Sequence, residues 1–210
     1  MYLQQKRMSI ERRVQLVEAL FEKLDTQIST FQHKTNLKCQ SGCGHCCTNP
    51  TIEASPLEFL PYAFHLFLNG QAETTLTTLK TKQNTTICHL YSPLNIVDNT
   101  IGRCGNYKYR GLICRLFGYA ASNDKYGQKR LVTCKIIKEG QQHAYQDTQD
   151  AINKGLYIPM FTEYYMQLSQ IDFTMGNVIV PINKALILAI EAVLQYYAYR
   201  PFPSGLVNIA

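Results

Sequence analysis

The stretch from Cys39 to Cys47 reads C-Q-S-G-C-G-H-C-C, and the interpretation of the whole chain starts from it. It holds four of the eight cysteines, together with Gly42 and Gly44, which let a backbone turn tightly around something small. Thiolates this close together would repel one another as bare anions. A shared cation removes that repulsion and deprotonates the thiols. The stretch therefore predicts a metal ion or an iron–sulfur cluster bound by thiolates.

Composition favours a soluble protein whose cysteines bind metal. The 210 residues, 46% of them hydrophobic, suit a single domain over residues 1–210 with a real core. The N-terminal residues are polar and show no secretory signal, and the longest apolar run, Ala185–Ile190, is far shorter than the roughly 20 residues of a membrane span. We therefore expect a cytoplasmic protein with no membrane partner. In a reducing cytosol, clustered cysteines bind metal or act in catalysis more often than they form disulfides.

The net charge of +6 is concentrated in residues 101–138, where nine basic side chains accompany one acid, Asp124. Three interpretations are open. The basic residues form a solvated surface, they offset the negative charge of thiolates around a metal, or they bind an unidentified protein or other anionic partner. We do not expect that partner to be nucleic acid.

Sequence patterns predict helices on both sides of the cysteines. Apolar residues at spacings of three and four predict an N-terminal helix over residues 7–32. Ser55-Pro56-Leu57-Glu58 is a capping box with proline at the first helical position, and it predicts a helix that continues to Leu68. Further helices are predicted for residues 71–82, 142–154, 159–171 and 181–199. The last of these is apolar nearly all round, which places it in the core or in a dimer interface.

The segment between these helices carries the remaining cysteines and reads as irregular with short strands. We expect strands at residues 87–91 and 130–137, the second containing Cys134 and pairing with residues 116–121. Residues 112–117, which carry Cys114, belong to the irregular part. The predicted fold class is mostly α with a small irregular β module, an α+β arrangement. The module covers about residues 37–138 and is flanked by the helix 7–32 and the C-terminal helices 142–199.

The cysteine spacing leaves the ligand set partly open. Cys39, Cys43 and Cys46 are spaced so that all three thiolates can face one centre. Cys47 follows at once, and adjacent side chains rarely reach the same metal, so Cys47 faces a second centre or is a structural thiol. The remaining ligands come from the other cysteines, Cys88, Cys104, Cys114 and Cys134. His45 and His89 stand beside cysteines and are weaker candidates for metal ligands. We expect His45 to lie near the metal without binding it, or to bind an anion. Neither zinc-ribbon spacing nor the ferredoxin run is present.

These motifs together resemble a known family. The order Cys39-x3-Cys43-x2-Cys46-Cys47, a capped helix, Cys88, Gly102-Arg103-Cys104 and Arg110-Gly111-Leu112-Ile113-Cys114-Arg115 is similar to the YkgJ-type CxxCxxCC family. The family is described as zinc- or iron-chelating domains with eight cysteines, and the resemblance covers about residues 37–136. It implies metal binding through all eight cysteines of this chain. One departure is visible, because the family usually has Arg-Pro where this chain has Arg110-Gly111.

A second pattern at the same residues is disfavoured. Cys39-x3-Cys43-x2-Cys46 is also the spacing of the radical S-adenosylmethionine motif, in which three thiolates hold a [4Fe-4S] cluster with one open iron. That fold needs a strand before the motif, whereas a helix is predicted here. Near the later cysteines, Arg103, Arg110 and Arg115 are expected to offset cluster charge or to bind an anionic substrate.

Two classes of function follow. The first is a metal-binding protein that holds an iron–sulfur cluster, with [4Fe-4S] favoured, or zinc. The second is an iron–sulfur enzyme of redox or group-transfer type, a class that includes enzymes that use S-adenosylmethionine. A cleft lined by Arg110 or Arg115 would favour this second class. The sequence has no G-x-S-x-G, Walker, G-x-G-x-x-G or H-E-x-x-H motif, so it offers no metal-free catalytic site. The number of centres, one or two, stays open.

Overall fold

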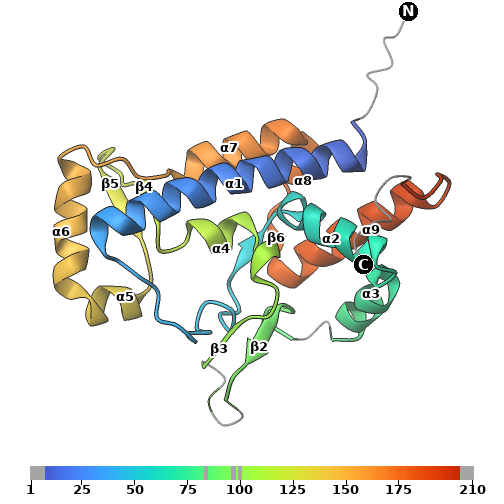
Figure 1. The fold of residues 1–210 in the computed structure, drawn as a ribbon, viewed down its shortest axis with the longest axis horizontal. Helices are drawn as coiled ribbons and strands as arrows, with labels where there is room; N and C mark the ends of the chain where they lie inside the picture. Colours follow the sequence, from blue (N-terminus) through green and yellow to red (C-terminus); the bar gives the residue numbers. More distant parts are fainter. Residues whose placement is uncertain (1–7, 83–84, 96–97, 99–100, 204–210) are drawn as a thin grey trace, which may run out of the picture.

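The computed structural model describes residues 8–82, 85–95, 98 and 101–203. Helices predominate, and the strands are short antiparallel pairs, which confirms the predicted fold class (Figure 1). The α-helices are α1 (Ile10–Thr35), α2 (Leu60–Leu68), α3 (Ala72–Thr81), α4 (Leu112–Leu116), α5 (Lys135–Gly140), α6 (Gln142–Asn153), α7 (Phe161–Ile171), α8 (Phe173–Gly176) and α9 (Ile182–Tyr197). The 3-10 turns are η1 (Pro56–Phe59) and η2 (Tyr107–Tyr109). The strands are β1 (Glu53–Ala54), β2 (Tyr91–Pro93), β3 (Gly102–Cys104), β4 (Ala120–Asn123), β5 (Lys129–Val132) and β6 (Val180–Pro181).

Helix α1 runs along one side of the molecule and contacts α2, α4 and α7 (Figure 1). It begins where the Ser9 hydroxyl accepts a hydrogen bond from the Arg12 N–H at 3.2 Å. It ends at Asn36, whose left-handed φ of 57° lets its N–H reach the Gln32 carbonyl. The expected helix over 7–32 is thus present but ends later; residue 7 lies outside the described residues. Its buried residues recur on one face: Ile10, Val14, Val17, Leu20, Phe21, Leu24, Ile28 and Phe31.

The core is centred on α9, η1 and α2. The apolar sequence of α9 places Ala185, Ala189 and Ile190 out of solvent, and the helix packs on η1, α2 and α3. This confirms the expected position of the last helix in the core. The capping box is also present, since the Glu58 carboxylate accepts a hydrogen bond from the Ser55 N–H at 2.8 Å. The first turn of the predicted 55–68 helix is the 3-10 turn η1.

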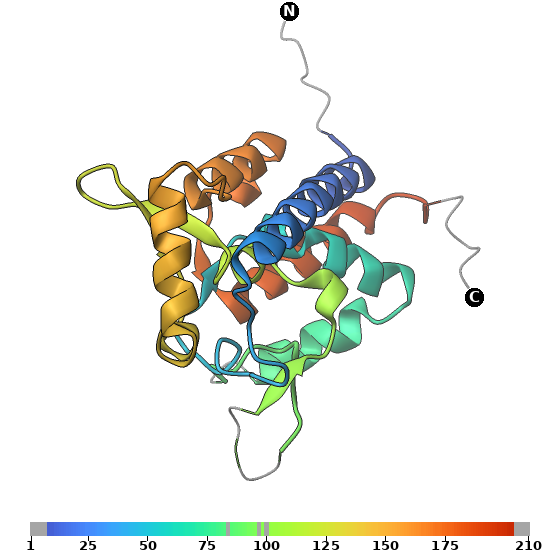
Figure 2. The ribbon, with the colours of Figure 1, turned by 60° about the vertical axis from the view of Figure 1, so that its left-hand side comes forward.

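The three strand pairs lie on different parts of this helical frame. β1 pairs with β6, so the end of the cysteine loop is fastened to the start of α9. β2 pairs with β3 in a hairpin that projects away from the helices (Figures 1 and 2). β4 pairs with β5, with Ala120 opposite Val132, on the side of the molecule occupied by α6 (Figure 1).

Three local predictions are wrong. Residues 112–116 form the helix α4, because the Glu58 carboxylate, a distant residue, accepts a hydrogen bond from the Ile113 N–H at 2.9 Å. Cys134 is not inside a strand: β5 ends at Val132, and Cys134 caps the start of α5. Strand β2 starts only at Tyr91, so the expected strand over 87–91 is displaced toward residue 93.

Within the described residues, no helix combines the length and the apolar character needed to cross a membrane.

Candidate metal centre

The cysteine loop folds as a series of tight turns. The Cys47 N–H donates to the Gly44 carbonyl at 2.9 Å, and the Cys43 N–H donates to the Gln40 carbonyl at 3.2 Å. Gly42 has a φ of +75°, the left-handed region that side chains rarely adopt. At Gly44 the constraint is space, because an added Cβ would lie 2.4 Å from the Tyr91 ring. The glycines between the cysteines therefore serve the turn and the close approach of Tyr91.

Backbone contacts join this loop to the segment that carries Cys88 and Cys104. The Cys88 N–H donates to the Cys47 carbonyl at 2.9 Å, and the Tyr91 N–H donates in turn to the Cys88 carbonyl at 2.9 Å. Tyr91 is paired with Cys104 across the β2–β3 hairpin. The Gly102 N–H completes the junction with a 2.8 Å bond to the Gly42 carbonyl. Three of the predicted ligands are thus joined within one small network.

A second set of contacts brings the start of the loop to α5. The Cys39 N–H donates to the Tyr119 hydroxyl at 2.8 Å. The Gln141 side chain, at the end of α5, accepts from the Lys38 N–H at 3.2 Å and donates to the Lys38 carbonyl at 2.6 Å. Cys134, at the other end of the same short helix, is an electrostatic neighbour of Cys39.

The eight cysteines are all free thiols, and they fall into two sets of neighbours. The first thiol group comprises Cys39, Cys43, Cys46 and Cys134. The second thiol group comprises Cys47, Cys88, Cys104 and Cys114. Cys47 links the two groups, since it is also a neighbour of Cys43 and Cys39. Each of the eight cysteines that the sequence singled out therefore has at least one other cysteine as an electrostatic neighbour.

Burial is the main influence on these thiols. Burial, followed by the nearby thiols of Cys134 and Cys39, raises the pKa of Cys46 to about 12. Burial likewise raises the pKa of Cys88 to about 12 and that of Cys114 well above the ordinary value. Such thiols stay protonated near neutral pH unless a cation stabilises the thiolate. A metal that binds here must therefore displace protons.

The donor set fits a thiolate-bound metal, but the side chains do not form a ready-made site. Among the described residues, no three His, Cys, Asp or Glu side chains are arranged so that they could hold one metal ion. Eight neighbouring thiols nevertheless match the ligand type that zinc and iron–sulfur clusters select. Metal binding must therefore draw the thiols closer together than they are in this arrangement.

The two candidate histidines occupy different positions. His45 is exposed at the surface of the loop, and its carbonyl accepts a hydrogen bond from the Thr48 hydroxyl at 3.2 Å. His89 is fixed through its backbone, where its N–H donates to the Asn183 side chain at 2.8 Å. Burial lowers the pKa of His89, so this side chain is neutral at physiological pH.

The three candidate arginines separate in space. Arg110 donates a hydrogen bond to the Cys114 carbonyl, and its charge opposes the burial-driven rise in the pKa of Cys39, Cys47 and Cys114. Arg103 is exposed on β3. Of the three, Arg110 is the cation placed among thiols of both groups.

Arg115 is buried and holds the segment that carries Arg110. It is 7% exposed and forms an ion pair with Asp25 of α1. Its guanidinium also donates to the carbonyls of Arg110 at 3.1 Å and Lys108 at 2.6 Å. These contacts of Arg115 connect η2 and the residues just before α4 to α1.

The Arg110-Gly111 departure has a local explanation. Gly111 has a φ of −63°, a value that proline also adopts. An added Cβ at Gly111 would lie 2.9 Å from the Glu58 carboxylate and 3.1 Å from the Phe59 ring. Glycine therefore keeps the backbone conformation while leaving room for the buried Glu58.

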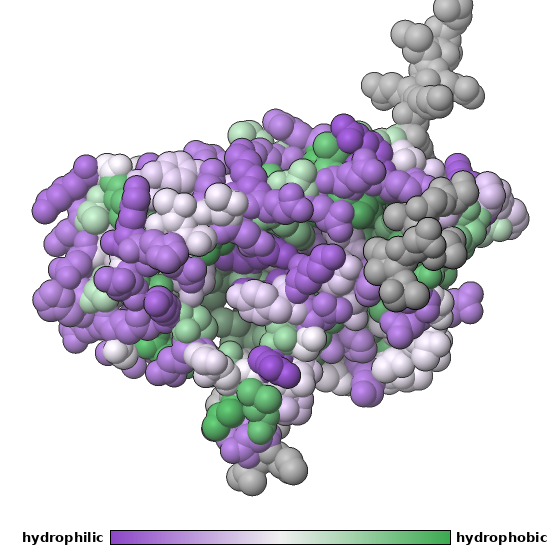
Figure 3. All heavy atoms as spheres, in the orientation of Figure 1, coloured by the Kyte–Doolittle hydropathy of each residue, from purple (hydrophilic) through white to green (hydrophobic). Residues whose placement is uncertain are grey.

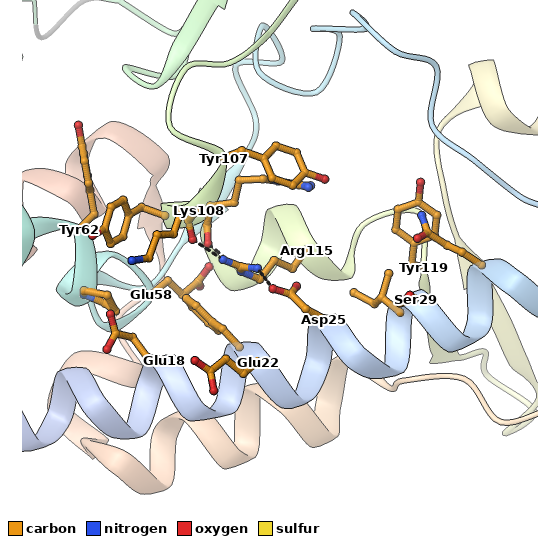
Figure 4. A pocket seen from close by; sticks show the side chains of 16 residues that line it. Glu18, Glu22, Asp25, Ser29, Glu58, Tyr62, Tyr107, Lys108, Arg115 and Tyr119 are labelled. Atoms are coloured by element: carbon orange, nitrogen blue, oxygen red, sulfur yellow. Dashed lines mark hydrogen bonds and ion pairs between the residues drawn. The ribbon is translucent and has the colours of Figure 1, made fainter.

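A cavity of about 560 Å³ lies between α1 and the segment that runs from η2 to Tyr119 (Figure 4). Figure 3 shows a hollow below α1 on a largely hydrophilic face. One wall is formed by Glu18, Glu22 and Asp25 of α1, and the Arg115–Asp25 ion pair crosses the interior. Two of the residues that line it contact the backbone of cysteines: Arg110 donates to the Cys114 carbonyl, and Tyr119 accepts from the Cys39 N–H.

Sequence reasoning missed this cavity and the role of Glu58. The acids of α1 recur at spacings of four and three, which places them on one helix face, but the same spacing is typical of a solvated face. The sequence pattern indicates only the capping-box role of Glu58. Its second contact, to Ile113 of α4, depends on the tertiary fold and leaves no local signal.

Comparison with known proteins agrees with the cysteine pattern. Residues 38–135 match the CxxCxxCC family model, described as a "putative zinc- or iron-chelating domain". No curated protein and no solved structure gave a match. The matched segment contains all eight cysteines and confirms the family resemblance noted over about residues 37–136. Residues 38–135 therefore resemble a cysteine-cluster family that is described as zinc- or iron-chelating, and this match supports metal binding by the segment.

Proposed function

We propose that this protein binds an iron–sulfur cluster or zinc through its eight cysteines, and that iron–sulfur is the favoured form. The observation that carries the proposal is the convergence of eight free thiols from five separate parts of the chain. They come from the loop 39–47, from Cys88, from β3, from α4 and from the start of α5. The secondary structure of these five parts does not explain why each of them carries a cysteine at this place. The family match supports metal binding as the reason.

The cavity is the reason to favour iron–sulfur over zinc. A structural zinc site is closed by its four ligands and needs no adjacent space. Here a cavity of about 560 Å³, within the usual range for small-molecule sites, lies next to Arg110 and Tyr119. An iron–sulfur cluster would supply electron transfer. The protein would supply the thiolates, and Arg110 would offset part of their negative charge.

Metal and acid-labile sulfide analysis of protein purified without oxygen tests the proposal. Iron and sulfide in comparable amounts, with a brown colour and broad visible absorption, are expected. Stoichiometric zinc without sulfide would support metal binding but reject the iron–sulfur cluster. A protein that contains neither, even after anaerobic reconstitution with iron and sulfide or with zinc, would contradict the whole proposal.

The cavity also favours a second candidate function, an iron–sulfur enzyme that acts on a small molecule. Within the described residues Glu18 and Glu22 have no ion pair, while Asp25 is engaged by Arg115. The carboxylates at this wall suit the positive charge of a ligand, and Lys108 and Arg110, which also line the cavity, suit a negative group; S-adenosylmethionine carries charges of both signs.

Equilibrium dialysis with S-adenosylmethionine tests this second function directly. Ser29→Phe should fill the cavity and abolish binding, and Thr26→Phe, on the same helix but not among the residues that line the cavity, is the matched control. Absence of binding by the metal-loaded wild-type protein would reject this cofactor and leave the metal-binding proposal intact.

A further inference from the structure

We infer that the eight cysteines hold two separate centres, one bound by the first thiol group and one by the second. This inference rests on the proposed metal binding and adds the number of centres and the ligands of each. Four thiolates are a complete ligand set for one tetrahedral zinc or for one [4Fe-4S] cluster. A single centre would leave four of the eight gathered thiols without a role.

The adjacent residues Cys46 and Cys47 are where the two groups divide. Among the neighbouring thiols, Cys134 has the largest electrostatic effect on the pKa of Cys46. Cys104 has the largest such effect on the pKa of Cys47. The backbone explains the divergence, because the Cys47 carbonyl is hydrogen-bonded to the Cys88 N–H at 2.9 Å. This bond directs residue 47 toward the β2–β3 hairpin, and Cys46 remains with the start of α5.

Each group has its own backbone frame. The second group is built on the β2–β3 hairpin, where Tyr91 joins Cys88 to Cys104 through a hydrogen bond and a strand pair. Cys114 of α4 reaches this group as a neighbour of Cys88 and Cys47. The two frames use different backbone hydrogen bonds, and the loop 39–47 contributes to both, so each frame can position its own centre.

The first group is built on the contact between the loop and α5. Gln141 at the end of α5 binds the backbone of Lys38 on both its N–H and its carbonyl. This contact sets the start of the loop beside the helix that Cys134 caps, and Tyr119 fixes the Cys39 N–H. No cysteine of the hairpin takes part in this frame.

The position of Arg110 agrees with two centres. Its charge acts on Cys39 of the first group and on Cys47 and Cys114 of the second. Two tetrathiolate centres near one another would repel, because each carries net negative charge. A guanidinium placed between them reduces that repulsion.

Adjacent cysteines that belong to different groups provide a sharp test. Metal and sulfide per chain are measured for Cys46→Ser, Cys47→Ser and two double variants. Each single variant should retain half of the wild-type metal. Cys46→Ser combined with Cys134→Ser, both from the first group, should also retain half. Cys46→Ser combined with Cys47→Ser should retain none. A single variant that loses all metal, or a within-group double variant that loses more than its single variant, would overturn the inference.

Native mass spectrometry of the wild-type protein keeps the test independent of variant folding. Two zinc ions or two clusters per chain are expected. One centre per chain would overturn the assignment of two groups and leave metal binding standing. A wild-type protein that holds no metal even after reconstitution would instead reject the proposed function, and the inference with it.

Discussion

The helical core and the cysteine module are stabilised in different ways. In the core, α9, η1 and α2 bury residues such as Leu57, Leu60 and Ile190 completely, so the hydrophobic effect stabilises their arrangement. In the module, the strands are two to four residues long and most thiols are only partly buried. The thiols are near one another but do not form a finished site. The difference indicates that the core is fixed by its own packing, whereas the module depends on bound metal for its final arrangement.

The largest expected effect is loss of metal from the module. Cys43→Ser and Cys46→Ser each remove a thiolate from the first thiol group. Binding free energy of structural metal is largely folding free energy, on the order of 10 kcal/mol for a zinc site. Both variants should lose the metal of that group, half of the wild-type total, as measured by metal analysis. In circular dichroism the module should unfold at a much lower temperature, whereas the helical core should keep its own melting transition. Wild-type metal content in both variants would show that the centre is misassigned.

A cavity in the core should have a smaller effect and one that is confined to stability. Leu60 is fully buried on α2, and Leu60→Ala should lower the free energy of unfolding by about 2–5 kcal/mol. Denaturant unfolding measures the change. Leu60 takes no part in the backbone hydrogen bonds that hold the two thiol groups. The metal content per folded chain should therefore stay at the wild-type value. A parallel loss of metal would mean that the two regions are not independent.

Glu58 joins the two regions and should give a pH effect of about 2 kcal/mol. Burial raises its pKa to about 6 from 4.5, in spite of hydrogen bonds from the N–H groups of Ser55 and Ile113. The folded state therefore binds this proton more tightly than the unfolded state does. The Glu58 contribution to stability is greatest below pH 4.5 and is lost as the pH rises through 6, by about 2 kcal/mol for a shift of this size.

Urea unfolding at pH 5 and pH 7 checks this prediction. Glu58→Gln removes the titration, so its stability should vary less between these two pH values than that of the wild type. The variant itself should be less stable at both, because an amide cannot accept both N–H hydrogen bonds as the carboxylate does. An unchanged pH dependence in Glu58→Gln would assign the effect to another group.

The smallest expected effect concerns the charge beside the thiols. Arg110→Gln should lower the reduction potential of a bound iron–sulfur cluster, on the order of tens of millivolts, because the cation favours the more negative reduced form. Arg115→Met should act in the same direction through the displacement of Arg110, whose carbonyl it holds at 3.1 Å. The exposed Arg103→Gln is the matched control. Equal potentials for Arg110→Gln and the control in protein-film voltammetry would rule out this role.

The sequence predicted the two regions with different success, and the reason is physical. Long periodic or capped segments, such as α1 and α9, could be identified because their apolar spacing carries the information locally. The short helices α4 and α5 could not, because a contact from Glu58 and the packing of Ile137 stabilise them. The cysteines could be selected as ligands from their chemistry and order. Their division into two groups and the cavity depend on contacts between distant residues.

Hydrogen–deuterium exchange before and after chelation of the metal tests the central claim most directly. With metal bound, amides in residues 39–47 and in the β2–β3 hairpin should be protected. Removal of the metal should abolish that protection while α9 and the adjoining part of α2 exchange as slowly as before, apart from their ends. Unchanged protection of the cysteine loop after complete removal of metal would contradict the account, because the module would then be stable without it.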